Sequence, residues 1–152
     1  MGRPDPVKQT IVVGVDGSED SKRAVIWAAN FAAALNARVV AVHAVGLLEH
    51  QPGDPSGAHL LPALQAWTSE LERLPADDVD LRLMPGDPIT ALTMVALEEH
   101  ATVVVVGTRG QGAGGGALVG STSLHLAERS AGALVIVPPS NWTDDYLAGL
   151  GR

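Results

Sequence analysis

The sequence contains no cysteine among its 152 residues. Disulfide bonds, cysteine-ligated zinc sites, iron–sulfur clusters and thiol nucleophiles are therefore excluded. A single domain of this length buries roughly 70% of the surface that its unfolded chain exposes, so it needs no such cross-link to fold. A chain without disulfides is compatible with a reducing compartment, and we expect a cytoplasmic protein.

Aromatic residues and positive charges are also scarce. Aromatics make up only 3% of the chain, so alanine, valine and leucine must build the core. Lysine and arginine together number 10 against 17 aspartates and glutamates, which gives a formal net charge of −7. This balance argues against a nucleic-acid-binding surface, which needs clustered positive charge. It does not exclude an anionic small ligand, because local backbone N–H groups bind phosphate inside acidic proteins.

Long hydrophobic runs are missing as well. No stretch reaches about 18 consecutive apolar residues, so we expect no membrane span. Residues 1–10 carry no apolar core, which argues against a signal peptide. The five histidines show no HxxxH or similar spacing, so we predict no zinc site. His43 lies within an apolar run and is predicted to be a packed residue rather than a ligand.

Short apolar runs alternate with segments of helical periodicity. Such alternation predicts a parallel sheet with helices on both faces. We therefore expect an α/β fold with a single doubly wound, Rossmann-like sheet of five parallel strands in the order 3-2-1-4-5, counted along the chain. The expected domain covers residues 11–139, between tails at 1–10 and 140–152. The expected strands cover residues 11–15, 38–45, 79–84, 102–106 and 133–137, and the expected helices cover 19–36, 61–74, 88–100 and 121–130.

Capping residues support two of these helices. Ser18 is the expected N-cap of the first helix, and Asp87 is the expected N-cap of the third, with Pro88 at its first position. Asn36 is suited to the end of the first helix. Residues 46–59 are rich in proline, glycine and histidine and are expected to form a surface loop.

The segment GTRGQGAGGGALVGSTS, at residues 107–123, is the most unusual part of the sequence, with seven glycines among seventeen residues. A polar loop at 14–18 follows the first expected strand. In open α/β sheets, ligands bind beyond the carboxyl ends of the strands where the strand order reverses, so both loops are expected to face one crevice. A flexible linker is the alternative. The three hydroxyls at 121–123, at a helix N-terminus, favour an anion site instead.

Two common phosphate-binding motifs do not fit this segment. A Walker A loop needs a lysine just before its serine or threonine, whereas Gly120 precedes Ser121 and residues 107–123 contain no lysine. Residues 110–115 match GxGxxG, but glycine density makes that match weak. No acidic residue follows near residues 133–139, where a nicotinamide dinucleotide site would require one.

Another pattern fits closely. Two residues separate Gly107 from Gly110, and nine residues separate Gly110 from Gly120-Ser121. This spacing resembles the ATP-binding signature G-2x-G-9x-G-S/T of the universal stress protein family. The resemblance extends from residue 11 to 139. It includes the segments IVVGVDGSEDSKRAVIWAANFA, VVAVHAV, GDPITALTMVALEEHATVVVVGTRGQG and ALVIVPP.

The resemblance implies a role for each signature residue. Gly107 and Gly110 would line the ribose and phosphates of ATP. Gly120, Ser121 and Ser123 would hold the phosphates with N–H and hydroxyl donors, and Thr122 would add a backbone donor. Glycine suits these positions because it has no Cβ to block a ligand.

Four further residues complete the implied site. Asp16 would lie beside the adenine and ribose, although it also suits a turn before Ser18. Gly14 would leave room for the base, and the backbone of Ala44 would meet the adenine. Arg109, the only cation of the glycine-rich segment, would reach a phosphate or lie in solvent.

The implied function is nucleotide binding in a stress-response regulator. ATP is the expected ligand, with Mg²⁺ as its possible companion. No residue of the pattern is suited to act as a dedicated general base, so we expect slow ATP hydrolysis at most. The alternatives are a protein of the same fold that binds cyclic AMP or AMP or acts through protein contacts, and an adenine-nucleotide-dependent hydrolase or transferase. The family resemblance also implies a homodimer that pairs residues 133–137 across a two-fold axis.

Overall fold

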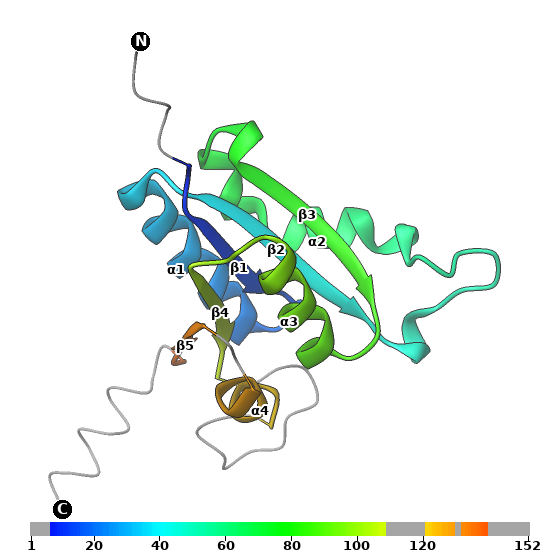
Figure 1. The fold of residues 1–152 in the computed structure, drawn as a ribbon. Coiled ribbons are helices and arrows are strands. Elements are labelled where there is room, and N and C mark those ends of the chain that lie inside the picture. The colour runs from blue at the N-terminus through cyan, green and yellow to red at the C-terminus, as the bar shows by residue number, and fades with distance from the viewer. Residues whose placement is uncertain (1–6, 109–120, 130–131, 140–152) are drawn as a thin grey trace, which may run out of the picture.

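The computed structural model describes residues 7–108, 121–129 and 132–139. Among these residues, one five-stranded parallel sheet has the order β3-β2-β1-β4-β5 (Figure 1). Both the doubly wound class and the strand order predicted from the sequence are confirmed. The strands are β1 (Thr10–Gly14), β2 (Arg38–Val45), β3 (Val79–Pro85), β4 (Val103–Gly107) and β5 (Ala133–Val137).

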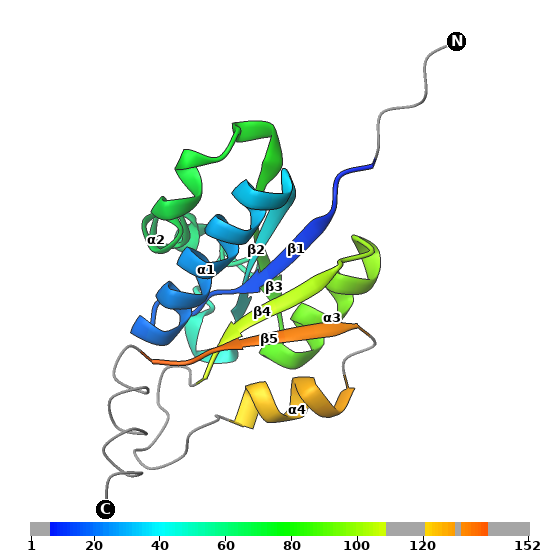
Figure 2. The same ribbon diagram turned by 90° about the vertical axis from the view of Figure 1, so that its left-hand side faces the viewer.

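The helices cover both faces of the sheet, as the alternating sequence pattern predicts. Helices α1 (Glu19–Leu35) and α2 (Leu61–Trp67) lie on one face, and α3 (Pro88–Glu98) and α4 (Ser121–Arg129) lie on the other (Figure 2). Strand β1 pairs with β2 on one side and with β4 on the other. The chain therefore reverses its direction of sheet growth at β1, which makes the carboxyl end of this strand the switch point.

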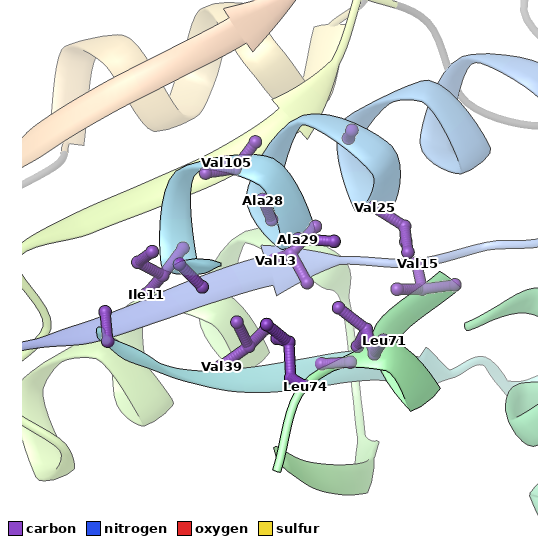
Figure 3. Close-up of a cluster of buried hydrophobic side chains, with 14 of the residues drawn as sticks. Ile11, Val13, Val15, Val25, Ala28, Ala29, Val39, Leu71, Leu74 and Val105 are labelled. Carbon is purple, nitrogen blue, oxygen red and sulfur yellow. The ribbon is translucent and has the colours of Figure 1, made fainter. Parts of the chain in front are cut away.

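Successive side chains along each strand point to opposite faces of the sheet, and the apolar ones form one core on each face. Ile11 and Val13 of β1 face α1 and α2, together with Ala28 and Leu71 (Figure 3). Val12, between them in sequence, faces α3 and α4. Small alanines on α1 allow the helix to pack closely on the sheet, so a chain with few aromatics still builds two buried apolar cores.

The predicted helix caps are present. The Ser18 side chain accepts a hydrogen bond from the Ser21 N–H, and the Asp87 side chain accepts one from the Thr90 N–H. Asn36 ends α1 in the left-handed conformation, with φ of 52°. These three residues position α1 and α3, whose N-termini both lie at the carboxyl edge of the sheet.

Two segments differ from the expectation. The helix predicted over residues 61–74 is wrong in its second half, because α2 ends at Trp67 and a 3-10 helix, η3 (Ser69–Arg73), follows. At the break, the Leu64 carbonyl accepts hydrogen bonds from both the Thr68 hydroxyl, at 2.7 Å, and the Thr68 N–H, at 3.1 Å. The loop expected over 46–59 contains two 3-10 turns, η1 (Leu47–Glu49) and η2 (Ala58–Leu60).

Candidate functional site

A pocket opens at the switch point, at the carboxyl ends of β1, β2 and β4. It holds about 560 Å³ of space that no atom occupies, open solvent at its mouth included. We call it the switch-point pocket, and its lining consists of Gly14, Val15, Asp16, Ser21, Val42, His43, Ala44, Pro88, Leu92, Val106, Gly107, Thr122 and Ser123.

The structure brings six of the ten predicted site residues together in this pocket: Gly14, Asp16, Ala44, Gly107, Thr122 and Ser123. A seventh, Ser121, begins α4 directly before the two lining residues Thr122 and Ser123. The other three lie outside the described residues: Arg109, Gly110 and Gly120. The described residues of the two segments that the sequence analysis singled out therefore line one crevice.

Asp16 is held in a turn between β1 and α1. Its Oδ1 accepts a hydrogen bond from the Ser18 N–H at 2.9 Å, and its own N–H donates to the Ser21 Oγ at 3.3 Å. Both interpretations of Asp16 from the sequence are compatible with this geometry, since the residue forms the turn and also lines the pocket. It places a carboxylate, a hydrogen-bond acceptor, at the β1 side of the crevice.

Gly107 occupies a position where α1 comes unusually close to β4. A Cβ built there would lie 2.6 Å from the backbone carbon and oxygen of Asp20, closer than such atoms are found to approach. The Gly107 carbonyl accepts a hydrogen bond from the Ser123 Oγ at 2.8 Å. This glycine therefore joins three elements, because it admits α1 and anchors the first turn of α4.

Gly14 lies against α3, on the face of the sheet opposite to α1. A Cβ there would meet the Leu92 Cδ1 at 3.1 Å and the Val106 Cγ1 at 3.3 Å, both ends of side chains that line the pocket. Gly14, Ala44 and the Leu92 side chain make this part of the pocket lining apolar. A flat aromatic ring is the kind of group that such a lining accommodates.

Sequence reasoning missed several lining residues. Ser21 lies one turn into α1, and Pro88 and Leu92 come from α3, which was predicted as a helix but not as a pocket wall. His43 was predicted to be packed, and this is confirmed, since it is only 4% exposed. It is also one of the residues that line the pocket. Its signal was its position, one residue before Ala44 at the carboxyl end of β2.

The described lining of the pocket contains few charges. Asp16 is acidic, His43 is titratable, and the lining includes no lysine or arginine within the parts of the chain that the structure covers. Within those same parts, no group of three or more histidines, aspartates or glutamates is arranged to hold a metal ion. Along residues 7–108, 121–129 and 132–139, no helix is both long and apolar enough to cross a membrane.

Comparison with known proteins identifies the family. Residues 8–138 match the family described as the universal stress protein family. The chain belongs to this family. A universal stress protein of Thermus aquaticus is 31% identical over 136 residues, which cover 85% of this chain and 98% of the relative. A Mycobacterium tuberculosis universal stress protein is 31% identical over 139 residues, covering 85% of this chain and 95% of the relative.

Solved structures support the same assignment. A universal stress protein crystallised in complex with cAMP superposes with a TM-score of 0.70 and 32% identity, covering 89% of this chain and all of the other. A universal stress protein of Archaeoglobus fulgidus superposes with a TM-score of 0.68 at 22% identity, over 86% of this chain and 98% of the other. The second likeness demonstrates the common fold.

Proposed function

We propose that this universal stress protein binds ATP in the switch-point pocket and acts as a regulator in a stress response. The observation that carries the proposal is that six of the predicted site residues line one crevice at the carboxyl edge of the sheet. Open α/β sheets bind their ligands at this place. ATP is proposed because the spacing of Gly107, Gly110, Gly120 and Ser121 follows the family's ATP-binding signature.

The nucleoside half of the ligand would occupy the side of the pocket formed by β1 and β2. Gly14 and Ala44 make this side apolar, which suits the adenine ring. The Asp16 carboxylate lies at its edge and would accept hydrogen bonds from ribose hydroxyls. A carboxylate there also repels phosphate, which orients the triphosphate toward the other side.

The phosphates would lie at the side formed by α4 and the end of β4. Thr122 and Ser123 line the pocket in the first turn of this nine-residue helix. Unpaired N–H groups and the helix dipole stabilise negative charge at such an end. The signature residues Gly110, Gly120 and Ser121, with Arg109, would complete the phosphate contacts, and Mg²⁺ would accompany the triphosphate.

A regulator is proposed rather than a dedicated enzyme. Phosphoryl transfer needs a positioned nucleophile, a metal held by the protein and concentrated positive charge. The sequence offers one arginine in the glycine-rich segment and no residue patterned as a general base. Slow ATP turnover is therefore the most activity that we propose, and the adenine-nucleotide-dependent hydrolase or transferase remains the weakest alternative.

Cyclic AMP is the second candidate ligand. It is the ligand of the 32% identical universal stress protein structure. A single phosphodiester charge would also need less positive charge than a triphosphate, which suits a described lining without lysine or arginine. Cyclic AMP and ATP share adenosine, so the same lining at Gly14 and Ala44 would serve both.

We also propose a homodimer that forms through β5. This strand is last in the sheet order, so its outer side is an edge. Leu134, Val135 and Ile136 are only half-buried along it. An exposed apolar edge strand invites pairing with another chain. Light scattering coupled to size-exclusion chromatography should give twice the mass of the 15.7 kDa chain; a single-chain mass would contradict the proposal.

The binding proposal is tested in two steps. First, the purified protein is denatured, and any released small molecule is identified by mass spectrometry. Second, ATP, ADP and cyclic AMP are titrated calorimetrically into the wild type, Gly120→Val and Gly114→Val. The Gly120→Val side chain would fill the phosphate space and should weaken ATP binding by at least about tenfold. Gly114→Val makes the same change within the glycine-rich segment but outside the signature, and should leave binding intact. Equal ATP affinity in all three proteins would refute the placement.

A further inference from the structure

His43 is a buried titratable residue at the candidate site to which the proposed function gives no role. It lies on β2 with 4% of its surface exposed, and it is one of the residues that line the switch-point pocket. The Trp67 ring of α2 packs edge-on against it, with ring centroids 5.3 Å apart. Burial against an indole normally favours a neutral imidazole, so the reason for a histidine here must lie in its polar contacts.

Both nitrogens of the ring face hydrogen-bond acceptors. Nδ1 lies 2.7 Å from the Val15 carbonyl oxygen, and Nε2 lies 2.9 Å from the Glu49 Oε2. A carbonyl oxygen and a carboxylate only accept hydrogen bonds, so each nitrogen must carry a proton to satisfy the geometry. Both contacts are made together only by the positively charged imidazolium.

Glu49 is the counter-ion of this ring. Burial works to raise the pKa of Glu49. The opposite effect is larger: hydrogen bonds from His43 and from the Gly46 N–H, together with the charges of His43 and His59, lower this pKa overall. Glu49 Oε1 accepts the Gly46 N–H at 3.1 Å, which closes the η1 turn. The carboxylate therefore stays ionised down to below its ordinary range.

The other surroundings of the ring contribute one further titratable group. Asp16 lines the same pocket from the β1–α1 turn, beside the Val15 carbonyl that His43 holds. On β3, the residue paired with His43 is Leu83, which is apolar. Loss of the ring proton would remove the positive charge that faces the Glu49 carboxylate, and would set an unprotonated Nε2 against a carboxylate oxygen.

We propose that His43 is a positioning residue of the switch-point pocket, which as an imidazolium ties the β1–α1 turn to the η1 turn and makes the affinity for anionic nucleotides fall as the ring loses its proton. The inference rests on the proposed nucleotide site. The pocket that His43 lines would hold an anionic ligand, whose negative charge stabilises the cation, so binding and ring protonation favour each other. Affinity is therefore highest below the range in which imidazoles titrate and is lost as the pH rises through it.

The first experiment needs no ligand. Nitrogen-15 NMR of the histidine rings reports which nitrogens carry protons, and His43→Gln identifies the signal. The wild type should show both His43 nitrogens protonated near about pH 6 and should lose the Nε2 proton toward about pH 8.5.

Because the chain has no cysteine, Leu48→Cys places a unique spin label on a fully exposed side chain beside Glu49. The label should become more mobile as that proton is lost; a ring already neutral near pH 6 would overturn the inference.

The second experiment measures affinity. Cyclic AMP is titrated at about pH 6 and at about pH 8.5, because its phosphodiester keeps a constant charge across the range in which imidazoles titrate. The wild type should bind about fivefold more weakly at the higher pH. Glu49→Gln keeps the size of the side chain, which is 36% exposed, but removes the counter-ion. The Glu49→Gln protein should fold normally, and a spin label at Leu48→Cys should be mobile in it at both pH values. Its affinity for cyclic AMP should depend less on pH than that of the wild type.

The outcomes separate the two proposals. Cyclic AMP binding with the same affinity at both pH values overturns the role of His43 and leaves the nucleotide site standing. A pH dependence of equal size in the wild type and Glu49→Gln also overturns it, because the titrating group would then lie outside the pair. If neither cyclic AMP nor ATP binds at either pH, the proposed function fails, and the role of His43 in binding fails with it.

Discussion

Gly107→Ala should destabilise the fold more than the same change at Gly14, although both glycines line the switch-point pocket at the ends of neighbouring strands. The new Cβ at Gly107 would lie 2.6 Å from the Asp20 backbone, which belongs to α1 and cannot move alone. At Gly14, the Cβ would meet the Leu92 Cδ1 at 3.1 Å, and a leucine methyl group yields by rotating. Neither glycine has a positive φ, so backbone strain does not distinguish the two.

The magnitude follows from these contacts. Overpacking a close-packed site costs roughly 1–3 kcal/mol, and a backbone clash belongs at the upper end, so Gly107→Ala should lose about 2–3 kcal/mol. For a domain of this size that corresponds to a melting temperature lowered by about 4–12 °C. Gly14→Ala should change the stability by less than about 1 kcal/mol, since the reduced freedom of its unfolded chain offsets the contact.

Urea denaturation with circular dichroism measures both variants under the same conditions, and differential scanning calorimetry gives the melting temperatures. A Gly107→Ala protein as stable as Gly14→Ala would refute the close packing of α1 on the end of β4. Because the Gly107 carbonyl also anchors Ser123, a displaced Gly107 should weaken ATP binding as well. Gly14→Ala is not a control for that second effect, since it also lines the pocket.

Three further predictions concern the rest of the fold. Leu64→Ala removes a fully buried side chain and should cost about 2–5 kcal/mol in urea unfolding; a loss below 1 kcal/mol would show that the α2 contact is loose. Asn36→Ala should lose about 1 kcal/mol while Asn36→Gly stays near the wild type, because Asn36 has a left-handed backbone. The Thr90 N–H lowers the pKa of Asp87, and hydrogen bonds from Arg82 and Arg38 lower that of Glu99. Both carboxylates therefore stabilise the fold above their ordinary range, and this stability should be lost as the pH falls below about 4. Asp87→Asn keeps a capping side chain and should show a smaller loss between about pH 6 and pH 3; an unchanged loss would exclude Asp87 as a contributor.

Local signals explain why much of the fold was predictable. The strands over 38–45 and 133–137 were predicted with the bounds that the structure has, because valine-rich runs there are closed by turn residues or proline. Ser18, Asn36 and Asp87 marked helix ends through side chains that act on their own backbone. Such interactions span at most a few residues, so one sequence carries them in full.

The features that were missed depend on contacts between distant segments or on competing local ones. At the break, the Thr68 hydroxyl donates to the Leu64 carbonyl, a contact that helical periodicity does not reveal. The approach of α1 to Gly107 joins residues 87 positions apart, and only the folded sheet shows it. The pairing of His43 with Glu49 depends on the path of the η1 turn, within a segment expected to be only loop.

The candidate site was predictable to the extent that it rests on a linear pattern. The spacing from Gly107 to Ser121 and the turn at Asp16 pointed to one crevice, and the residues of these segments that the structure describes do line one pocket. The walls contributed by Pro88 and Leu92 of α3 were not predicted, because no motif marks them. Their place follows from the packing of α3 over the end of β1.

The location of the bound nucleotide tests the central claim most directly. Backbone amide NMR signals are recorded while ATP is added to saturation. The largest changes should cluster at the ends of β1, β2 and β4 and in the first turn of α4, at Gly14, Asp16, Ala44, Gly107 and Ser123. Changes confined to another surface, such as the groove between α3, α4 and β5 that His100 lines, would contradict the account.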